Sequence, residues 1–287
     1  MIAPDWKDYE VIAAGGGEKL ERWGGIYLLR PDPQAIWTAP FDLGKYPKLH
    51  ARYLRASDGG GRWQFFRNMP EEWTIGWRDC KFLIKPMGFK HTGLFPEQAY
   101  NWDRMGKIAD GSGKRLNVLN LFGYTGGASV ALAKRGAFVT HVDAAKGMVD
   151  RCRQNAKLSG VPDDGIRYIV DDCKKFVQRE IKRGKRYDAV LMDPPSYGRG
   201  PSGETWKLED SLFELVSLVT EVLDDPRFFL INSYTTGLQP TVIKNILSIA
   251  LNGARGNIDA YELCLPVADE SKGRVELPCG CSAIFWR

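Results

Sequence analysis

Metal-ligating and redox-active side chains are sparse in this chain. It contains three histidines, and its six cysteines lack the paired spacing of a zinc finger or of a disulfide framework. Cys279 and Cys281 form a short Cys-Gly-Cys pair, but none of His50, His91 and His141 stands at ligand spacing from it. We therefore expect free thiols and no metal site.

Long hydrophobic runs, internal repeats and low-complexity tracts are absent too. No segment approaches the roughly 18 apolar residues of a membrane span, and the N-terminal sequence Met-Ile-Ala-Pro-Asp-Trp-Lys-Asp lacks a signal pattern. With 287 residues, 44% hydrophobic and 26% charged, we expect a globular cytoplasmic protein of one large or two smaller domains. Its net charge of +5 suits a polyanionic partner, but it equally suits a slightly cationic enzyme without one.

The chain divides into two compositional regions near residue 100. Residues 1–100 carry most of the nine tryptophans and short alternating runs, such as 63–67 and 80–85. This pattern predicts short, mostly antiparallel strands. We expect a strand-rich domain over residues 1–100 that recognises the substrate, and a catalytic domain over 101–287.

From about residue 114, strand and helix patterns alternate. Strands are expected at 116–122, 137–142, 166–171, 187–192, 227–232, 258–265 and 281–286, and helices at 126–135, 145–158, 173–183, 209–223 and 240–251. Such alternation predicts an α/β, Rossmann-like fold with a mostly parallel, doubly wound sheet. The last strand follows its predecessor without a helix between them, so it must be antiparallel to its neighbour.

A glycine-rich turn follows the first strand of this region. Residues Gly123, Tyr124, Thr125, Gly126 and Gly127 form a turn whose backbone N–H groups can meet a carboxylate. Acidic residues end the next two strands. Asp143 can accept from both ribose hydroxyls of a nucleoside cofactor, and Asp172 with the Cys173 N–H can bind an adenine edge. A ligand-free Rossmann-like domain or a nicotinamide dinucleotide site is the alternative, although the second glycine of Gly-x-Gly-x-x-Gly is missing.

A second motif ends the strand at 187–192. It reads Asp193-Pro194-Pro195-Ser196-Tyr197. Two prolines fix the backbone and remove two N–H donors, which leaves the carbonyl groups of Asp193 and Pro194 to receive an amino group or a ring edge, while Tyr197 offers a stacking face. A plain rigid turn is the alternative. Together the two motifs predict a methyltransferase that uses S-adenosylmethionine, with residues 193–197 as the catalytic turn.

Residues 80–240 resemble the bacterial family of class I S-adenosylmethionine-dependent methyltransferases that includes the ribosomal large-subunit RNA cytosine-C5 methyltransferase. The resemblance is carried by Lys-His-Thr-Gly-Leu-Phe-Pro-Glu-Gln (90–98), Leu-Asn-Leu-Phe-Gly-Tyr-Thr-Gly-Gly (119–127), His-Val-Asp-Ala-Ala-Lys (141–146), Val-Asp-Asp-Cys-Lys-Lys-Phe (170–176) and Met-Asp-Pro-Pro-Ser (192–196). It implies that Phe95 and Gln98 lie over the cofactor and that residues 193–195 border the methyl-transfer site. To the expected cofactor contacts we add residues that flank these turns: Asn120, Phe122 and Ala144.

Two features depart from that family. We expect the family's N-terminal RNA-binding module, of the kind shared with pseudouridine synthases, to be absent. Cytosine-C5 chemistry also needs a cysteine thiolate, but Thr235 and Ser196 stand where two classes of such enzymes place it. We therefore expect no C5 chemistry unless Cys173, Cys279 or Cys281 reaches the site.

The segment 45–67 is the clearest indication of the substrate. Six cations face one acid, Asp58, and alternate with aromatic residues: Lys45, Lys48, Arg52, Arg55, Arg62 and Arg67, with Tyr46, Tyr53, Trp63, Phe65 and Phe66. Cations for phosphates and aromatics for unpaired bases are typical of single-stranded RNA recognition. The alternative is a small domain with an aromatic core and a solvated cationic face. The loop 198–207, with Arg199 and Lys207, is expected to close over the substrate.

These observations favour methylation of a base in ribosomal RNA. Two other functions remain open: methylation of a protein side-chain amide or amine, and RNA binding without catalysis.

Overall fold

The computed structural model describes residues 1–56, 60–199, 205–235, 237–271 and 273–287. The chain forms two compact units. The larger unit consists of Met1, Asn101–Leu263 and Gly280–Arg287, and the smaller unit of Ile2–Tyr100 and Cys264–Cys279. The smaller unit is therefore built from two separate segments of sequence.

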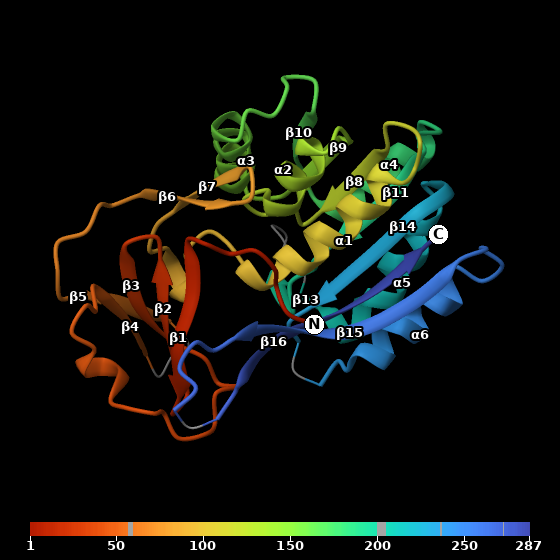
Figure 1. Cartoon of the computed structure of the whole chain (residues 1–287). Coiled ribbons are helices and arrows are strands. Elements are labelled where there is room, and N and C mark those ends of the chain that lie inside the picture. The colour runs from red at the N-terminus through yellow and green to blue at the C-terminus, as the bar shows by residue number, and fades with distance from the viewer. Residues whose placement is uncertain (57–59, 200–204, 236, 272) are drawn as a thin grey trace. The chain divides into compact units, whose positions relative to one another are not determined.

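A seven-stranded sheet is the centre of the larger unit (Figure 1). Its order is β10-β9-β8-β11-β14-β16-β15. The bounds are Asn117–Leu121 for β8, Phe138–Asp143 for β9, Ile166–Val170 for β10, Tyr187–Met192 for β11, Leu223–Ser233 for β14, Asn257–Pro266 for β15 and Glu276–Trp286 for β16. Strands β8 to β11 and β14 pair in parallel, and β16 pairs antiparallel with β14. The predicted doubly wound fold with an antiparallel last strand is confirmed.

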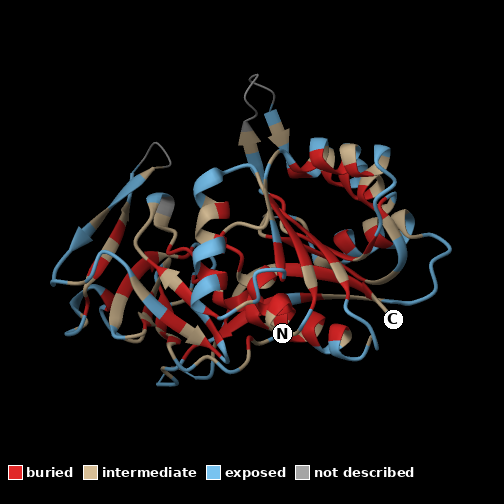
Figure 2. Cartoon of the chain, turned by 90° about the horizontal axis from the view of Figure 1, so that it is seen from above, coloured by how far each residue is buried: buried red, intermediate tan, exposed pale blue. Residues whose placement is uncertain are grey.

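Helices cover both faces of this sheet. Their bounds are Ala99–Asp110 for α1, Gly127–Lys134 for α2, Lys146–Leu158 for α3, Cys173–Lys182 for α4, Leu208–Thr220 for α5 and Pro240–Ala250 for α6. Phe176 of α4, Leu215 of α5 and Ile243 of α6 pack in one core with Ile231 of β14. Because side chains alternate along a strand, Asn232 points to the opposite face, where α1 lies in Figure 1. Figure 2 shows the buried residues concentrated in the strands and in the inner helix surfaces.

The sequence patterns did not indicate α1. Its sequence, Ala-Tyr-Asn-Trp-Asp-Arg-Met-Gly-Lys-Ile-Ala-Asp, is polar and contains Gly106 near its middle. A Cβ atom at Gly106 would lie 2.5 Å from Cδ of Arg135, so this glycine makes room for a neighbouring helix end rather than ending a helix.

The smaller unit holds a five-stranded sheet in the order β1-β2-β3-β4-β5. Its elements are β1 (Tyr9–Gly15), β2 (Glu18–Trp23), β3 (Ile26–Pro31), β4 (Ala51–Arg55) and β5 (Gly61–Phe65), with a separate hairpin of β6 (Trp73–Trp77) and β7 (Cys80–Ile84), and short 3-10 helices η1 (Leu43–Lys45), η2 (Gly88–Lys90) and η3 (Pro96–Gln98). All these strand pairs are antiparallel except β3 with β4. The expected strand-rich N-terminal region is confirmed.

A buried ion pair fixes one end of the 90–98 motif within this unit. Arg30 Nε and Nη2 donate to the two carboxylate oxygens of Glu21, at 2.6 and 2.8 Å, and Tyr9 Oη donates to Glu21 Oε1 at 2.7 Å. Arg30 Nη1 also donates to the Lys90 carbonyl at 2.9 Å. Removing one partner of a buried ion pair leaves an uncompensated charge, at a cost of about 3–5 kcal/mol, so Glu21 keeps Arg30 in place. Arg30 in turn holds the Lys90 carbonyl at the start of the 90–98 motif.

Candidate active site

The predicted site residues of the larger unit gather at the carboxyl ends of the parallel strands. β8 lies between β9 and β11, and the chain continues from β8 to β9 on one side and returns to β11 on the other. Ligands of open α/β sheets bind at this kind of switch point. The glycine turn follows β8, Asp143 ends β9, Asp172 follows β10 and Asp193 follows β11.

The turn after β8 depends on its glycines. A Cβ atom at Gly123 would lie 2.3 Å from His141 Cε1, and one at Gly126, where φ is +86°, would lie 2.1 Å from Cys152 Sγ. Phe122 and Tyr124 also have positive φ values, 57° and 52°. The backbone therefore follows a tight path that larger side chains would block, and α2 begins directly after it, at Gly127.

Asp143 holds this turn in place. Its Oδ2 accepts from the Tyr124 backbone N–H at 2.9 Å and its Oδ1 accepts from the Ala145 N–H at 2.8 Å. Burial raises the pKa of this carboxyl, and the two N–H donors oppose that rise. Each carboxylate oxygen has a second lone pair, so Asp143 can accept two further hydrogen bonds, as a ribose diol requires.

A buried polar network lies beneath the turn. Asn120 Nδ2 donates to Ser129 Oγ at 2.8 Å, and Ser129 Oγ lies 3.0 Å from His141 Nδ1. Burial lowers the pKa of His141 to about 4, so this ring is neutral near pH 7. Thr125 is also buried, and its carbonyl accepts from Asn155 Nδ2 at 2.9 Å. The side chain of Asn120 thus supports the turn from below, a role that the sequence pattern did not reveal.

Asp172 and Cys173 begin α4. Asp172 Oδ1 accepts from the Lys175 N–H at 2.8 Å and so caps the helix. As the first helical residue, Cys173 has a backbone N–H without a partner inside the helix, which suits donation to a ring nitrogen. Its Sγ accepts from the Phe122 N–H at 3.3 Å, and this bond connects the adenine-binding candidates with the glycine turn.

The Asp193-Pro-Pro turn is anchored by the neighbouring strand β14. Asn232 Nδ2, at the end of β14, donates to Asp193 Oδ1 at 3.0 Å. Pro194 is buried, whereas Pro195, Ser196 and Tyr197 are exposed. Sequence reasoning missed Asn232, although a polar residue at the end of a strongly apolar strand was a visible signal.

The segment after this turn forms a hairpin of β12 (Tyr197–Arg199) and β13 (Thr205–Lys207) (Figure 2). The ends of the predicted 198–207 loop are therefore paired strands, whereas residues 200–204 lie outside the described part of the chain. Trp206 Nε1 donates to the Pro195 carbonyl at 2.7 Å, and its ring centroid lies 6.4 Å from that of Phe122. Trp206 therefore links the Asp193-Pro-Pro turn with the glycine turn.

Thr235 and Ser196, which the resemblance places where cytosine-C5 enzymes carry cysteine, form a pair of hydroxyl groups. Thr235 Oγ1 donates to Ser196 Oγ at 2.7 Å. The cysteines considered as substitutes are poor nucleophiles. Burial raises the pKa of Cys173 and Cys279, and that of Cys281 to about 11, while Cys281 Sγ donates to the Leu238 carbonyl at 3.1 Å. These thiols are protonated near neutral pH, which disfavours covalent attack on a base.

Two predicted cofactor contacts belong to the smaller unit. Phe95 is the N-cap of η3, and the Gln98 N–H donates to its carbonyl at 3.1 Å. The ring of Phe95 packs edge-on against His91, with the centroids 5.6 Å apart. That Phe95 and Gln98 reach the cofactor stays a prediction from the resemblance.

The helices of the described residues include none with the length and apolar content of a membrane span. Within the described part of the chain, no cluster of three or more His, Cys, Asp or Glu side chains is placed to bind a metal ion.

Comparison with known proteins agrees with this site. Residues 32–222 match a family described as S-adenosylmethionine-dependent methyltransferase. A crystal structure of a SAM-dependent methyltransferase from Agrobacterium tumefaciens is 32% identical, has a TM-score of 0.92, and the match covers 99% of this chain and 92% of that one.

Two curated relatives share shorter regions. Ribosomal RNA large subunit methyltransferase K of Neisseria meningitidis serogroup B is 28% identical over 62% of this chain and 51% of its own length. Ribosomal RNA large subunit methyltransferase I of Aeromonas salmonicida is 33% identical over 41% of this chain and 29% of its own length. This chain thus spans about half of the first relative and less than a third of the second.

Proposed function

We propose that this chain, which belongs to the family of S-adenosylmethionine-dependent methyltransferases, methylates a base of ribosomal RNA. The carrying observation is the Asp193-Pro-Pro turn, anchored by Asn232 next to the glycine turn of the cofactor site. The names of the relatives from Neisseria and Aeromonas support ribosomal RNA as the substrate class. Such a substrate implies that the protein acts in the cytoplasm.

The residues around the glycine turn fit the cofactor. We assign the backbone of Gly123–Gly127 to its carboxylate, Asp143 to its ribose, and Asp172 with the Cys173 N–H to its adenine. Phe122 and Ala144 flank the same site. The missing side chains at Gly123 and Gly126 leave the cradle open, and Asp143 keeps lone pairs for hydroxyl groups. When bound, S-adenosylmethionine supplies a methyl group that is already activated as a sulfonium.

The protein's main task is then to orient the acceptor and exclude water. We assign the Asp193 carboxylate and the Pro194 carbonyl to the amino or ring N–H group of the acceptor base. Tyr197, whose exposed fraction is 54%, offers a face for stacking. Pro195 and Ser196 shape the turn, because their carbonyl groups accept from Trp206 Nε1 and from the Leu208 N–H at 3.1 Å.

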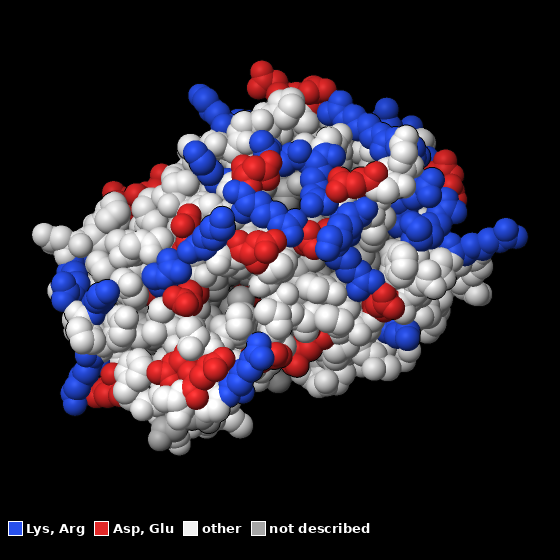
Figure 3. Space-filling view, viewed as in Figure 1, with Lys and Arg blue, Asp and Glu red and all other residues white. Residues whose placement is uncertain are grey.

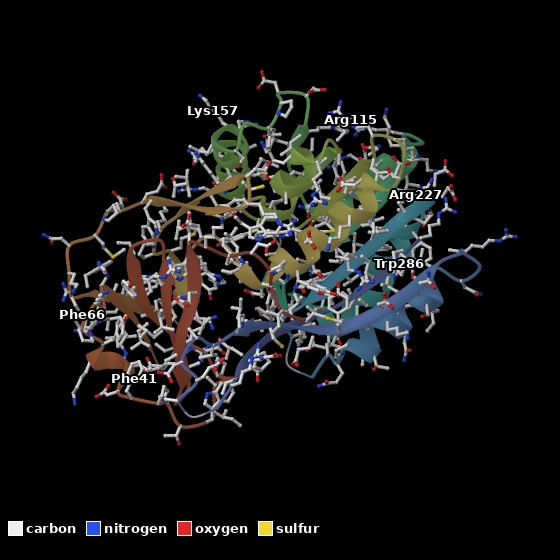
Figure 4. All side chains as sticks on the ribbon, viewed as in Figure 1. Phe41, Phe66, Arg115, Lys157, Arg227 and Trp286 are labelled. Atoms are coloured by element: carbon white, nitrogen blue, oxygen red, sulfur yellow. The ribbon has the colours of Figure 1, made fainter. Side chains whose placement is uncertain are left out.

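Strand β5 of the smaller unit is the proposed RNA-contacting edge. It is the last strand of its sheet, and Arg55, Arg62, Phe65 and Phe66 beside it are exposed. Phe66 points outward in Figure 4, and Lys and Arg side chains lie along this edge in Figure 3. Cations for phosphates beside exposed rings for bases suit an unpaired RNA segment.

Three other members of the 45–67 cluster, Arg52, Tyr53 and Trp63, have contacts within the unit. Tyr53 is buried against Trp63, with ring centroids 5.5 Å apart. Arg52 donates from Nε and Nη2 to both carboxylate oxygens of Glu18, at 3.0 and 2.9 Å. The alternative of an aromatic core therefore applies to Tyr53 and Trp63, and we restrict the proposed RNA contact to the exposed residues.

Transfer of labelled methyl groups tests the function. The protein is incubated with labelled S-adenosylmethionine and either unmodified large-subunit ribosomal RNA or RNase-treated cell extract. We expect label in the RNA and none in protein. Label in protein after RNase treatment would replace our proposal with the amide or amine methyltransferase. Tight cofactor binding without transfer to either substrate would reject the proposal as well.

A matched pair of phenylalanines tests the β5 edge. Phe66 and Phe213 have the same exposed fraction, 49%, but Phe213 lies on α5 of the larger unit. Because stacking of one base on an aromatic ring contributes about 1–3 kcal/mol, Phe66→Ala should raise the KM for RNA by about tenfold. Phe213→Ala should leave KM unchanged. Equal KM values for the two variants would exclude Phe66 from the RNA contact.

A further inference from the structure

Five polar side chains of the larger unit form one continuous chain of hydrogen bonds that ends at the catalytic turn. Tyr261 Oη donates to Asn101 Oδ1 at 2.7 Å, and Asn101 Nδ2 donates to Ser282 Oγ at 3.0 Å. Ser282 Oγ donates to Asn232 Oδ1 at 2.8 Å, and Asn232 Nδ2 donates to Asp193 Oδ1 at 3.0 Å. We call this chain of residues the Asp193 relay.

The relay follows the order of the sheet. Tyr261 lies on β15, Ser282 on β16, Asn232 on β14 and Asp193 directly after β11, and these strands are successive neighbours. Asn232 and Ser282 are direct cross-strand partners in the β14–β16 pair. Asn101, from α1 on the same face, connects Ser282 with Tyr261. The fold thus places these side chains in line, whereas their positions in sequence are far apart.

The side chains of the relay are buried, so their polar groups have lost the hydrogen bonds that water would make. Asn101 and Ser282 are fully buried, and Asn232 and Tyr261 are exposed by 1% and 6%. A polar group in such a place costs stability unless its hydrogen bonds are made, and apolar side chains could fill the same volume. The polar residues at these strand positions therefore call for an explanation beyond packing.

Every donor in the relay points toward Asp193. Hydrogen bonds that run in one direction polarise each other, so each bond makes the next donor stronger. At the far end, the Arg104 guanidinium lies over the Tyr261 ring, 5.2 Å from its centroid, and 5.9 Å from the centroid of the Trp286 ring. Arg104 is ion-paired with Asp259, and its guanidinium holds the Tyr261 ring in place at the start of the relay. The donors of the relay end at the Asp193 carboxylate.

We infer that Asn232, Ser282, Asn101 and Tyr261 are positioning residues that hold the Asp193 carboxylate in one orientation for methyl transfer. The inference rests on the proposed function, because it assigns Asp193 to the acceptor base. The Asn232 hydrogen bond restrains the Asp193 carboxylate, and only some orientations of this carboxylate meet the acceptor in a productive geometry. A loss of orientation lowers turnover more than it weakens binding.

Ser282→Ala and Tyr261→Phe cut the relay at its middle and at its far end. We expect Ser282→Ala to lower kcat by about tenfold, the effect of losing one hydrogen bond that acts on a charged group, with a smaller fall in Tyr261→Phe. The KM for RNA and the affinity for S-adenosylmethionine should stay unchanged. Tyr187→Phe is the control, since Tyr187 Oη donates to the buried carboxylate of Glu180 at 2.7 Å outside the relay. It should lower the melting temperature without lowering kcat.

A second measurement does not depend on activity. The side-chain amide signals of Asn232 and Asn101 are recorded by NMR of the whole protein and assigned with Asn→Leu variants. Both signals should shift in Ser282→Ala and in Tyr261→Phe, and neither should shift in Tyr187→Phe.

If the wild-type protein methylates RNA but kcat is the same in Ser282→Ala, the positioning role is refuted and the function stands. If the wild type does not methylate RNA, the function fails, and an unshifted Asn232 signal in Ser282→Ala would refute the relay by itself.

Discussion

Asp143 has a structural role in the glycine turn and a proposed role in cofactor binding, and two measurements on one variant distinguish them. Its carboxylate accepts from the N–H groups of Tyr124 and Ala145, at 2.9 and 2.8 Å, and thereby closes the glycine turn. The same carboxylate is the proposed acceptor for the ribose hydroxyls. Asp143→Ala should therefore destabilise the cofactor-free protein and also weaken cofactor binding.

The two effects can be estimated from these contacts. A hydrogen bond to a charged group contributes about 1.5–3 kcal/mol, so the loss of two such bonds lowers the free energy of unfolding by about 3 kcal/mol, taking the lower limit because Asp143 is only half-buried. Loss of the ribose contacts removes about 2 kcal/mol of binding, which is about 30-fold in affinity. Loosening of the turn adds to this, so we expect about a 100-fold weaker affinity for S-adenosylmethionine.

Calorimetric titration with S-adenosylmethionine and thermal unfolding give both quantities. Asp188→Ala is the matched control, because Asp188 Oδ2 accepts from the Asn117 N–H at 2.7 Å at the amino end of the same sheet. The control should lower the melting temperature and keep the affinity. An Asp143→Ala protein that binds the cofactor as tightly as the wild type would refute the assignment of the ribose site.

Three further predictions concern catalysis and pH. Asp193→Asn should keep the fold and cofactor affinity while lowering kcat by about 100-fold, and normal turnover would remove Asp193 from the catalytic residues. Because Thr235 and Ser196 are hydroxyl residues, RNA containing 5-fluorocytosine should form no complex with the protein that survives a denaturing gel, and a stable complex would contradict this. Burial lowers the pKa of His141 from 6.5 to about 4, so the unfolded chain gains a proton in this interval that the folded protein does not. The free energy of unfolding should thus fall by about 3 kcal/mol from this residue as pH drops from 6.5 to 4, and a His141→Gln protein with the same pH dependence as the wild type would refute it.

The strands and helices of the larger unit were predictable because their signals are local. Buried strands contain apolar runs such as Ala-Val-Leu-Met at 189–192, and glycines such as Gly136 and Gly160, both with positive φ, follow helices. Helix α1 was not predictable, because its polar residues are satisfied by partners distant in sequence, such as Ser282 for Asn101. Local patterns carry no information about such pairs.

The same distinction applies to the site. Asp143, Asp172 and Asp193 each end a strand or follow one, so sequence reasoning could select them. Asn232 and Trp206 act through contacts to residues 39 and 11 positions away, and only the folded chain reveals them. In the segment 45–67 the sequence could not separate the exposed Phe66 from the buried Tyr53, because strand pairing decides which rings face solvent.

Methylation of a base of ribosomal RNA by this chain is tested most directly by mass analysis of nucleosides. They are released from unmodified large-subunit ribosomal RNA after reaction with S-adenosylmethionine. We expect a nucleoside whose base is heavier by one methyl group with the wild-type protein, and far less of it with Asp193→Asn. Nucleosides unchanged in mass, or a methyl group on the ribose instead of the base, would contradict it.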